Sequence, residues 1–327
     1  MNMKKIVYAV VAVVCVAALV FLAYRFASTP EETQNPMPAE ESQTQTPPEA
    51  ESNLPAEENV IQESEIQGEL STEAPAEEPQ STGKSVIGKS VQSRDITAYH
   101  FGGGSEEILF VGGIHGGYAW NTARLAYQLI DYLTAHPEEI PANAKITIIP
   151  VLNPDGLAKV VDKTGMFNAA DVSTSADTAA ARFNANNVDL NRNFDCEWQA
   201  KAVWQNKTVS AGSAAFSEPE STAIRDYAQS HSIAGVVAWY GFGGGVYVSS
   251  CDSKMLPESE IIMNLYSRLS GYAPNQDFSA YAISGDMTDW FSKNNVPAIG
   301  VLLTAANDTE WDKNWAGSKE IIKHFAQ

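Results

Sequence analysis

Basic residues and cysteines are scarce in this chain of 327 residues. Lys and Arg number 21 against 40 Asp and Glu, which gives a formal net charge of −19. Because nucleic acids are bound through basic patches, no nucleic-acid partner is expected. The three cysteines are Cys15, Cys196 and Cys251, and their spacing is not that of zinc ligands. They are too few for a disulfide framework, and the sequence leaves open whether Cys196 and Cys251 pair.

Charged residues are absent from one run near the N-terminus, Ile6–Tyr24, which Lys4 and Lys5 precede. A run of about 19 apolar residues is long enough to span a bilayer as a helix. The two lysines favour a cytoplasmic N-terminus, which places the rest of the chain outside. We therefore expect residues 1–27 to be a membrane anchor of a protein at the cell surface. A cleaved signal peptide, which would leave the protein secreted, is the alternative.

Lys, Arg, Asp and aromatic residues are all missing from residues 28–83, which are rich in Glu, Pro, Gln, Ser and Thr. Such a composition cannot bury enough apolar surface to offset the entropy lost on ordering, so a disordered linker is expected. Its 14 glutamates supply most of the net charge. The acidity therefore predicts a self-repelling, extended tether rather than a cation-binding site.

Residues 84–327 are enough for one α/β domain with a single core. Apolar runs predict strands at 95–101, 108–113, 145–151, 235–240, 246–249 and 298–303. Helical periodicity predicts helices at 121–135, 217–230, 257–269, 286–292 and 313–325, the second of them capped by Ser217. Strands that alternate with helices favour a mixed, mostly parallel twisted sheet covered by helices on both faces.

The stretch Ile108–Thr122 joins the second predicted strand to a helix, and it places His115 just past the strand, after Gly112 and Gly113. In open α/β sheets, ligands bind at the carboxyl ends of strands. The stretch resembles the zinc-binding turn of the carboxypeptidase A family of zinc metallopeptidases. In that family a histidine and a glutamate that follows it by three or four residues both ligate zinc. The resemblance extends to the C-terminus and implies a carboxypeptidase-like domain over residues 84–327.

Three further motifs carry the same resemblance: Arg182-Phe183-Asn184, the run Val188–Phe194, and Tyr281–Trp290. By the resemblance, Arg182 matches the arginine that stabilises the oxyanion. Asn191 and Arg192 match the pair that holds the substrate's terminal carboxylate, and Tyr281 matches a mobile tyrosine that closes over bound peptide. A guanidinium group suits this task because it meets a carboxylate bidentately and stays charged at any working pH.

The groups that the family uses to cut peptides are missing. Where the second zinc ligand belongs the chain has Tyr118 and Ala119, the third ligand position holds Gly241, and Leu302 replaces the catalytic glutamate. A catalytic zinc needs three protein ligands and an open position for water. His115 alone does not supply this set, so no cofactor and no confident catalytic residue are expected.

The sequence therefore predicts a membrane-anchored, extracytoplasmic carboxypeptidase-like pseudoenzyme. It would bind free carboxyl ends of peptides, with cell-wall peptides as candidates, through Arg182, Asn191, Arg192 and Tyr281. One alternative is an active zinc carboxypeptidase whose metal is held by other ligands. A second alternative is a structural scaffold that binds nothing.

Overall fold

A computed structural model describes residues 83–327. The predicted membrane anchor and almost all of the predicted linker lie outside these residues. Within the described part, no helix combines the length and the apolar character that a membrane crossing requires.

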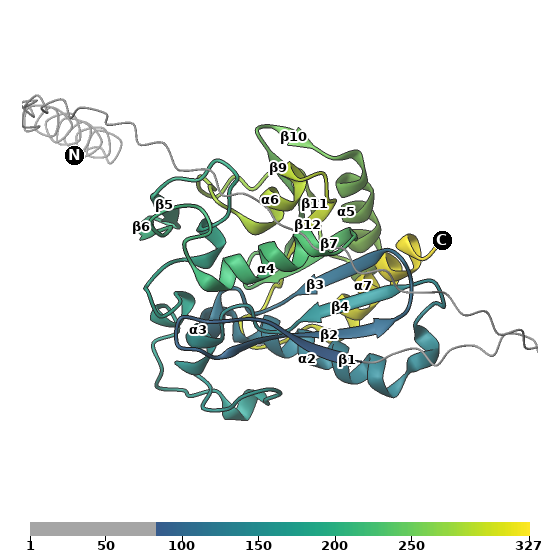
Figure 1. The fold of residues 1–327 in the computed structure, drawn as a ribbon, viewed down its shortest axis with the longest axis horizontal. Coiled ribbons are helices and arrows are strands. Elements are labelled where there is room, and N and C mark those ends of the chain that lie inside the picture. Colours follow the sequence, from purple (N-terminus) through teal and green to yellow (C-terminus); the bar gives the residue numbers. More distant parts are fainter. Residues whose placement is uncertain (1–82) are drawn as a thin grey trace, which may run out of the picture. The chain divides into compact units, whose positions relative to one another are not determined.

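An eight-stranded mixed sheet forms the centre of the domain (Figure 1). Its order is β1-β2-β4-β3-β7-β12-β8-β11. The four strands β4, β3, β7 and β12 pair in parallel. Strands β1 and β2 add antiparallel at one edge, and β8 pairs antiparallel with β12 and parallel with β11 at the other. The bounds are β1 Gly83–Lys89, β2 Asp95–Gly102, β3 Glu107–Val111, β4 Lys145–Ile149, β7 Ile233–Tyr240, β8 Gly245–Val248, β11 Pro274–Asn275 and β12 Ala298–Leu302.

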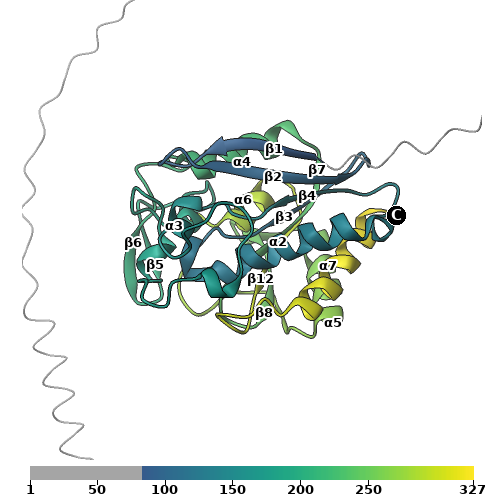
Figure 2. The same ribbon diagram turned by 90° about the horizontal axis from the view of Figure 1, so that it is seen from below.

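Helices cover both faces of this sheet. Side chains alternate along a strand, and in β3 Ile108 and Phe110 join one hydrophobic cluster while Leu109 and Val111 join the other. The first cluster includes α2 (Trp120–Ala135), α5 (Pro257–Ser270) and α7 (Trp311–Phe325), and the second includes α4 (Pro219–Ser230) and α6 (Met287–Lys293). Figure 2 shows α2 and α7 on the side of the sheet away from α4.

The predicted mixed α/β fold is confirmed, and each predicted strand and helix is present within a few residues. The prediction missed β1, the short helix α3 (Pro154–Ala158), the hairpin of β5 (Lys201–Trp204) and β6 (Lys207–Ser210), and the short strands β9 (Ser250–Cys251), β10 (Lys254–Met255) and β11. The predicted Ser217 cap is wrong. Glu218 is the N-cap of α4 and Pro219 its first residue, because the Ser217 hydroxyl bonds the Glu218 carboxylate instead.

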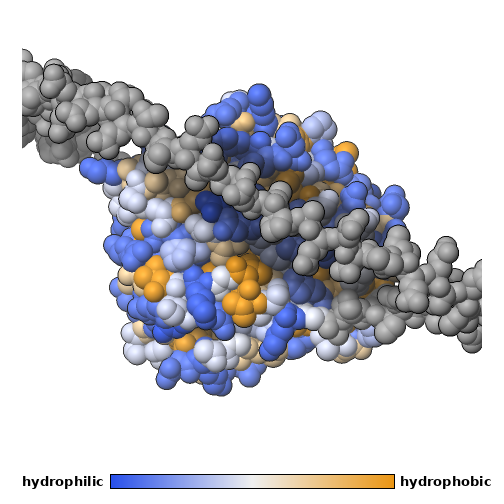
Figure 3. Space-filling model, in the orientation of Figure 1, coloured by the Kyte–Doolittle hydropathy of each residue, from blue (hydrophilic) through white to orange (hydrophobic). Residues whose placement is uncertain are grey.

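Cys196 and Cys251 form a disulfide, with their Cα atoms 5.9 Å apart. The sequence had left this pairing open. The bond ties the segment that follows Arg192 to β9, and both cysteines are buried. On the face of the domain in Figure 3, hydrophobic residues gather in separate small groups among hydrophilic ones.

Candidate functional site

A cavity of about 830 Å³ opens at the carboxyl ends of the parallel strands β3, β7 and β12. This is the edge at which open α/β sheets bind ligands. The cavity brings together most of the predicted site residues, although they come from distant parts of the chain. His115, Arg182, Asn191, Arg192, Gly241, Tyr281 and Leu302 all line it.

His115 follows β3 by way of a tight turn. Gly113 has φ of +62°, which only glycine adopts readily, and its N–H donates to the Thr122 hydroxyl at 3.1 Å. The imidazole of His115 is 6% exposed, lies 5.5 Å from the Tyr240 ring, and has no hydrogen-bond partner for either nitrogen among the described residues. Burial, with the charges of Arg182 and Arg192, lowers its pKa well below the ordinary value.

The positions that would complete a zinc site adjoin His115 but carry no donor. A Cβ placed on Gly241 would lie 2.8 Å from the Cβ of Ala119, so these two positions face each other. Leu302 packs against Gly243, beside the same turn. Within residues 83–327, no group of three or more His, Cys, Asp or Glu side chains is placed to hold a metal ion. The residues that are present at this position do not fit zinc.

Asp189, which is fully buried, organises both arginines of the cavity. Its Oδ2 accepts from Nε of Arg182 at 2.8 Å, and its Oδ1 accepts from the backbone N–H of Asn191 at 3.2 Å. The second bond caps the 3-10 turn Leu190–Arg192. Burial opposes ionisation of Asp189, but the charges of Arg182 and Arg192 keep its pKa below the ordinary value. Ionised Asp189 is therefore the ion-pair partner of Arg182, and it also acts on Arg192 through its charge.

Arg182 is held rigidly. Its side chain is 3% exposed, and its guanidinium carbon lies 4.7 Å from the centre of the Trp204 ring and 5.6 Å from that of Tyr118. Aromatic faces attract a guanidinium group, so the ion pair and the two rings fix its position. The carbonyl of Arg182 also accepts from the Asn153 amide at 3.1 Å.

Arg192 differs from Arg182 because it has no carboxylate partner among the described residues. It is 1% exposed, and its hydrogen bonds within the described residues go only to backbone carbonyls: Nε donates to Val203 of β5 at 3.1 Å, and Nη1 donates to Asn191. The Tyr281 ring lies 5.9 Å from its guanidinium carbon. A buried charge without an ion-pair partner is costly, so this group is suited to receive an anion.

Asn191, the other half of the predicted carboxylate clamp, is occupied within the protein. Its amide donates to Oδ2 of Asp286 at 2.6 Å, and its carbonyl oxygen accepts from the Met287 N–H at 3.1 Å. Asp286 in turn caps α6 by accepting from the Thr288 N–H at 2.7 Å. Asn191 therefore positions Arg192 and α6 more directly than it offers donors to a ligand.

Aromatic side chains form one wall of the cavity, and two of them, Trp204 and Phe242, were not singled out by the sequence analysis. Trp204 of β5 packs with Val209 of β6, and Tyr118, Phe183 and Tyr281 pack against this pair. Tyr118 also meets Phe242, which is 37% exposed. The hairpin was missed because its two short strands are half polar, and only its tertiary contacts place Trp204 over Arg182.

Acidic residues line another part of the cavity, among them Asp286, Asp289 and Glu197. Burial and the nearby Asp286 carboxylate raise the pKa of Asp289 well above its ordinary value, although the Ser250 N–H donates to it at 2.9 Å. The cavity thus has a cationic part around the two arginines and an acidic part at the start of α6.

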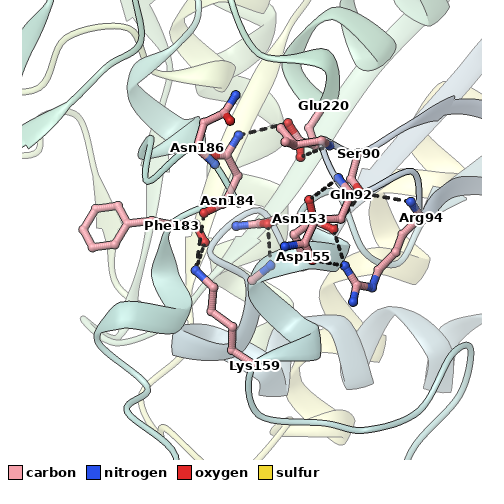
Figure 4. Close-up of polar contacts among 12 residues, drawn as sticks. Ser90, Gln92, Arg94, Asn153, Asp155, Lys159, Phe183, Asn184, Asn186 and Glu220 are labelled. Carbon is pink, nitrogen blue, oxygen red and sulfur yellow. Dashed lines mark hydrogen bonds and ion pairs between the residues drawn. The ribbon is translucent and has the colours of Figure 1, made fainter.

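Asn153 and Asp155 have structural roles that the sequence analysis did not predict. Asn153 caps α3, its side chain accepting from the Gly156 N–H at 2.8 Å, and it also holds the Arg182 carbonyl. Asp155 accepts from the Ser90 hydroxyl at 2.7 Å, the Gln92 N–H at 3.0 Å and Arg94 at 2.7 Å (Figure 4). The β1–β2 connection is thereby fastened to the segment that supports Arg182.

Comparison with known proteins finds the zinc carboxypeptidase family model over residues 70–308. The chain is 27% identical over 225 residues to gamma-D-glutamyl-L-diamino acid endopeptidase 1 of Lysinibacillus sphaericus, a match covering 63% of this chain and 56% of that protein. It is 26% identical over 212 residues to mouse (Mus musculus) carboxypeptidase M, covering 58% and 42%. The chain thus spans about half the length of these curated relatives.

Solved structures support the same fold. Carboxypeptidase A of Helicoverpa armigera superposes with a TM-score of 0.57 at 20% identity, covering 75% of this chain and 68% of that one. Murein-tripeptide amidase MpaA of Escherichia coli O157 gives a TM-score of 0.51 at 16% identity, covering 76% and 94%. The family match covers well over half of the chain, and its motifs meet in one cavity at the expected edge of the sheet. The protein belongs to the zinc carboxypeptidase family.

Proposed function

We propose that this protein binds the free carboxyl end of a peptide in the cavity and does not hydrolyse it. The observation that carries the proposal is Arg192, a buried guanidinium that lines the cavity and has no carboxylate partner within residues 83–327. A carboxylate ligand would supply the missing counter-charge through charge-assisted hydrogen bonds. Arg182, which bonds Asp189 through Nε alone, and Tyr281 would complete the contact.

Three positions support the absence of hydrolysis: Ala119 and Gly241 where the family has zinc ligands, and Leu302 where it has the catalytic glutamate. A methyl group, a hydrogen atom and an isobutyl group can neither ligate zinc nor move a proton. The retained arginines and the lost metal donors together favour binding over cleavage. Zinc held by unexpected ligands is the competing hypothesis.

Cell-wall peptides are the ligand class that we favour. The Lysinibacillus relative is named for a bond between γ-D-glutamate and a diamino acid, and the Escherichia coli structure is of a murein-tripeptide amidase. A tether and anchor at residues 1–83, as the sequence predicts, would present the domain to the cell wall. Membrane fractionation of the full chain and of a chain lacking residues 1–27 tests this anchor, because only the full chain should sediment with membranes.

Calorimetric titration of the full-length protein with γ-D-glutamyl-L-lysine, as free acid and as carboxamide, tests the binding proposal. The acid should bind, and the carboxamide should bind at least about tenfold more weakly, because it lacks the charge that Arg192 requires. Equal affinities would remove the carboxylate clamp. If neither binds, the scaffold hypothesis is favoured. Products found by chromatography after incubation would instead support a working peptidase.

A further inference from the structure

His115 is an unusual buried side chain in this domain. It is 6% exposed and lines the cavity, yet neither Nδ1 nor Nε2 has a hydrogen-bond partner among the described residues. Buried side-chain polar groups are nearly always hydrogen-bonded, and leaving one unpaired costs free energy. A ring with two unpaired nitrogens beside a cavity therefore points to a ligand that pairs with it.

A metal ion does not explain this ring, because Ala119 and Gly241 offer no second donor and no metal-binding group of three is present within residues 83–327. Packing does hold the ring in place, since Tyr240 lies 5.5 Å away on the neighbouring strand β7. In either protonation state an imidazole has at least one N–H to donate. His115 therefore holds at least one unpaired N–H in the wall of the cavity.

The nearby cationic groups define the ligand chemistry. Arg182 and Arg192 line the same cavity and are close enough to act on His115 through their charges. Resting on the proposed function, a peptide carboxylate at Arg192 leaves the carbonyl of the last peptide bond as the next acceptor along the ligand.

We propose that His115 binds the peptide directly, donating a hydrogen bond from its ring to the carbonyl oxygen of the last peptide bond. The family's first zinc-ligand position is thus a ligand-recognition residue in this chain. The ligand class is a peptide end with two acceptors, the terminal carboxylate and the preceding carbonyl. A lone amino acid or a simple carboxylate lacks the second acceptor and binds more weakly.

The test uses the full-length protein in buffer with EDTA, so that no metal can bridge ring and ligand. The probes are γ-D-glutamyl-L-lysine and its thioamide, in which sulfur, a weaker acceptor, replaces the oxygen of the peptide bond. The wild-type protein should bind the thioamide about tenfold more weakly, which is the effect of about one hydrogen bond. Equal binding of the two probes would overturn the proposal without any variant.

Variants then assign the effect to His115. His115→Phe keeps a ring against Tyr240 but removes both nitrogens, so it should bind the parent peptide about tenfold more weakly and no longer discriminate against the thioamide. His115→Gln retains an N–H donor and should recover part of the affinity. His136→Phe, at the surface end of α2, is the matched control and should behave as the wild type.

The outcomes separate the two proposals. If His115→Phe still discriminates between the probes as strongly as the wild type, His115 is not the partner, while preference for the free acid over the carboxamide would keep the proposed function intact. If the wild type binds neither probe, the proposed function itself fails. If the Phe variant does not fold, the test still rests on His115→Gln and on the difference in affinity of the wild type for the peptide and its thioamide.

Discussion

Two groups of polar side chains differ in how fully their hydrogen-bonding groups are satisfied within the protein. Around Asp155, a cluster that also contains Ser90, Gln92, Arg94 and Glu220 pairs donors with acceptors across the β1–β2 connection, α3 and α4 (Figure 4). In the cavity, Arg192 has no ion-paired carboxylate and His115 has no hydrogen-bond partner among the described residues. The first arrangement stabilises the fold, whereas the second leaves hydrogen-bonding capacity for a ligand.

Arg182 lies in the cavity but is paired like a structural residue, so its removal should have the largest effect on stability. Arg182→Met leaves Asp189 buried, 0% exposed and without its cation. We expect the free energy of unfolding to fall by about 4 kcal/mol, the usual cost of breaking a buried pair. Urea denaturation measures this. Arg268→Met, at a pair whose arginine is 65% exposed, should cost less than about 0.5 kcal/mol.

A double variant sharpens that result. Adding Asp189→Asn to Arg182→Met removes the stranded charge, so the double variant should be less destabilised than the sum of the two single variants. Additive losses would show that the ion pair does not hold this side of the cavity together.

Asp155 should come second, with an effect on stability alone. Asp155→Ala strands the Ser90 hydroxyl and the Gln92 N–H and should lower the free energy of unfolding by about 3 kcal/mol. Among the folded molecules, peptide affinity should stay as in the wild type, because Asp155 does not line the cavity. Asp95→Asn, from the exposed pair with Lys89, is the control with little effect on either quantity. A loss of affinity in Asp155→Ala would break the division between the two groups.

Arg192 should show the opposite behaviour. Arg192→Met removes a buried charge that has no carboxylate partner in the described domain. The free energy of unfolding should therefore change by no more than about 1 kcal/mol. Affinity for a free carboxyl end should fall by about a hundredfold, since charge-assisted bonds to the ligand are lost. Calorimetry and urea denaturation on the same preparation measure both. A variant that unfolds readily but still binds would reverse our assignment.

Glu220 provides the smallest effect, visible only as a pH dependence. Burial raises its pKa above the ordinary value even though Asn184 and the Val91 N–H donate to it. The folded protein therefore holds this proton to a higher pH than the unfolded chain does. The contribution of Glu220 to the free energy of unfolding is present at low pH and is lost as pH rises through the raised pKa.

Glu220→Gln removes this titration. The stability of the wild type relative to the variant should therefore fall between acidic and neutral pH. Urea midpoints of both proteins across that range test this, and parallel curves would contradict it.

The sequence predicted the fold well because the apolar runs of β3, β4, β7 and β12 are long and end in recognisable turns. Candidate site residues could be proposed for a similar reason, since Arg182 and the run Val188–Phe194 are local patterns. What the sequence could not predict is pairing. Asp189 forms its ion pair with Arg182 and not with Arg192, and only the three-dimensional arrangement determines which arginine is paired.

Short or half-polar elements were missed on physical grounds. The strands of the β5–β6 hairpin have four residues each, and one edge strand, β1, is mostly exposed, so none shows a clear apolar pattern. Asn153 and Asp155 lie in a sequence typical of a turn, and their second role depends on partners far along the chain, Arg182 and Ser90. Such contacts leave no local signal.

The most direct test of the account is whether peptide binding depends on zinc. Calorimetric titration of the full-length protein with γ-D-glutamyl-L-lysine should give the same affinity in EDTA and in a slight excess of zinc, with no cleavage products in either. This result would place recognition in Arg192 and its neighbours rather than in a metal. Binding that requires zinc, or hydrolysis once zinc is added, would contradict it and restore the metallopeptidase hypothesis.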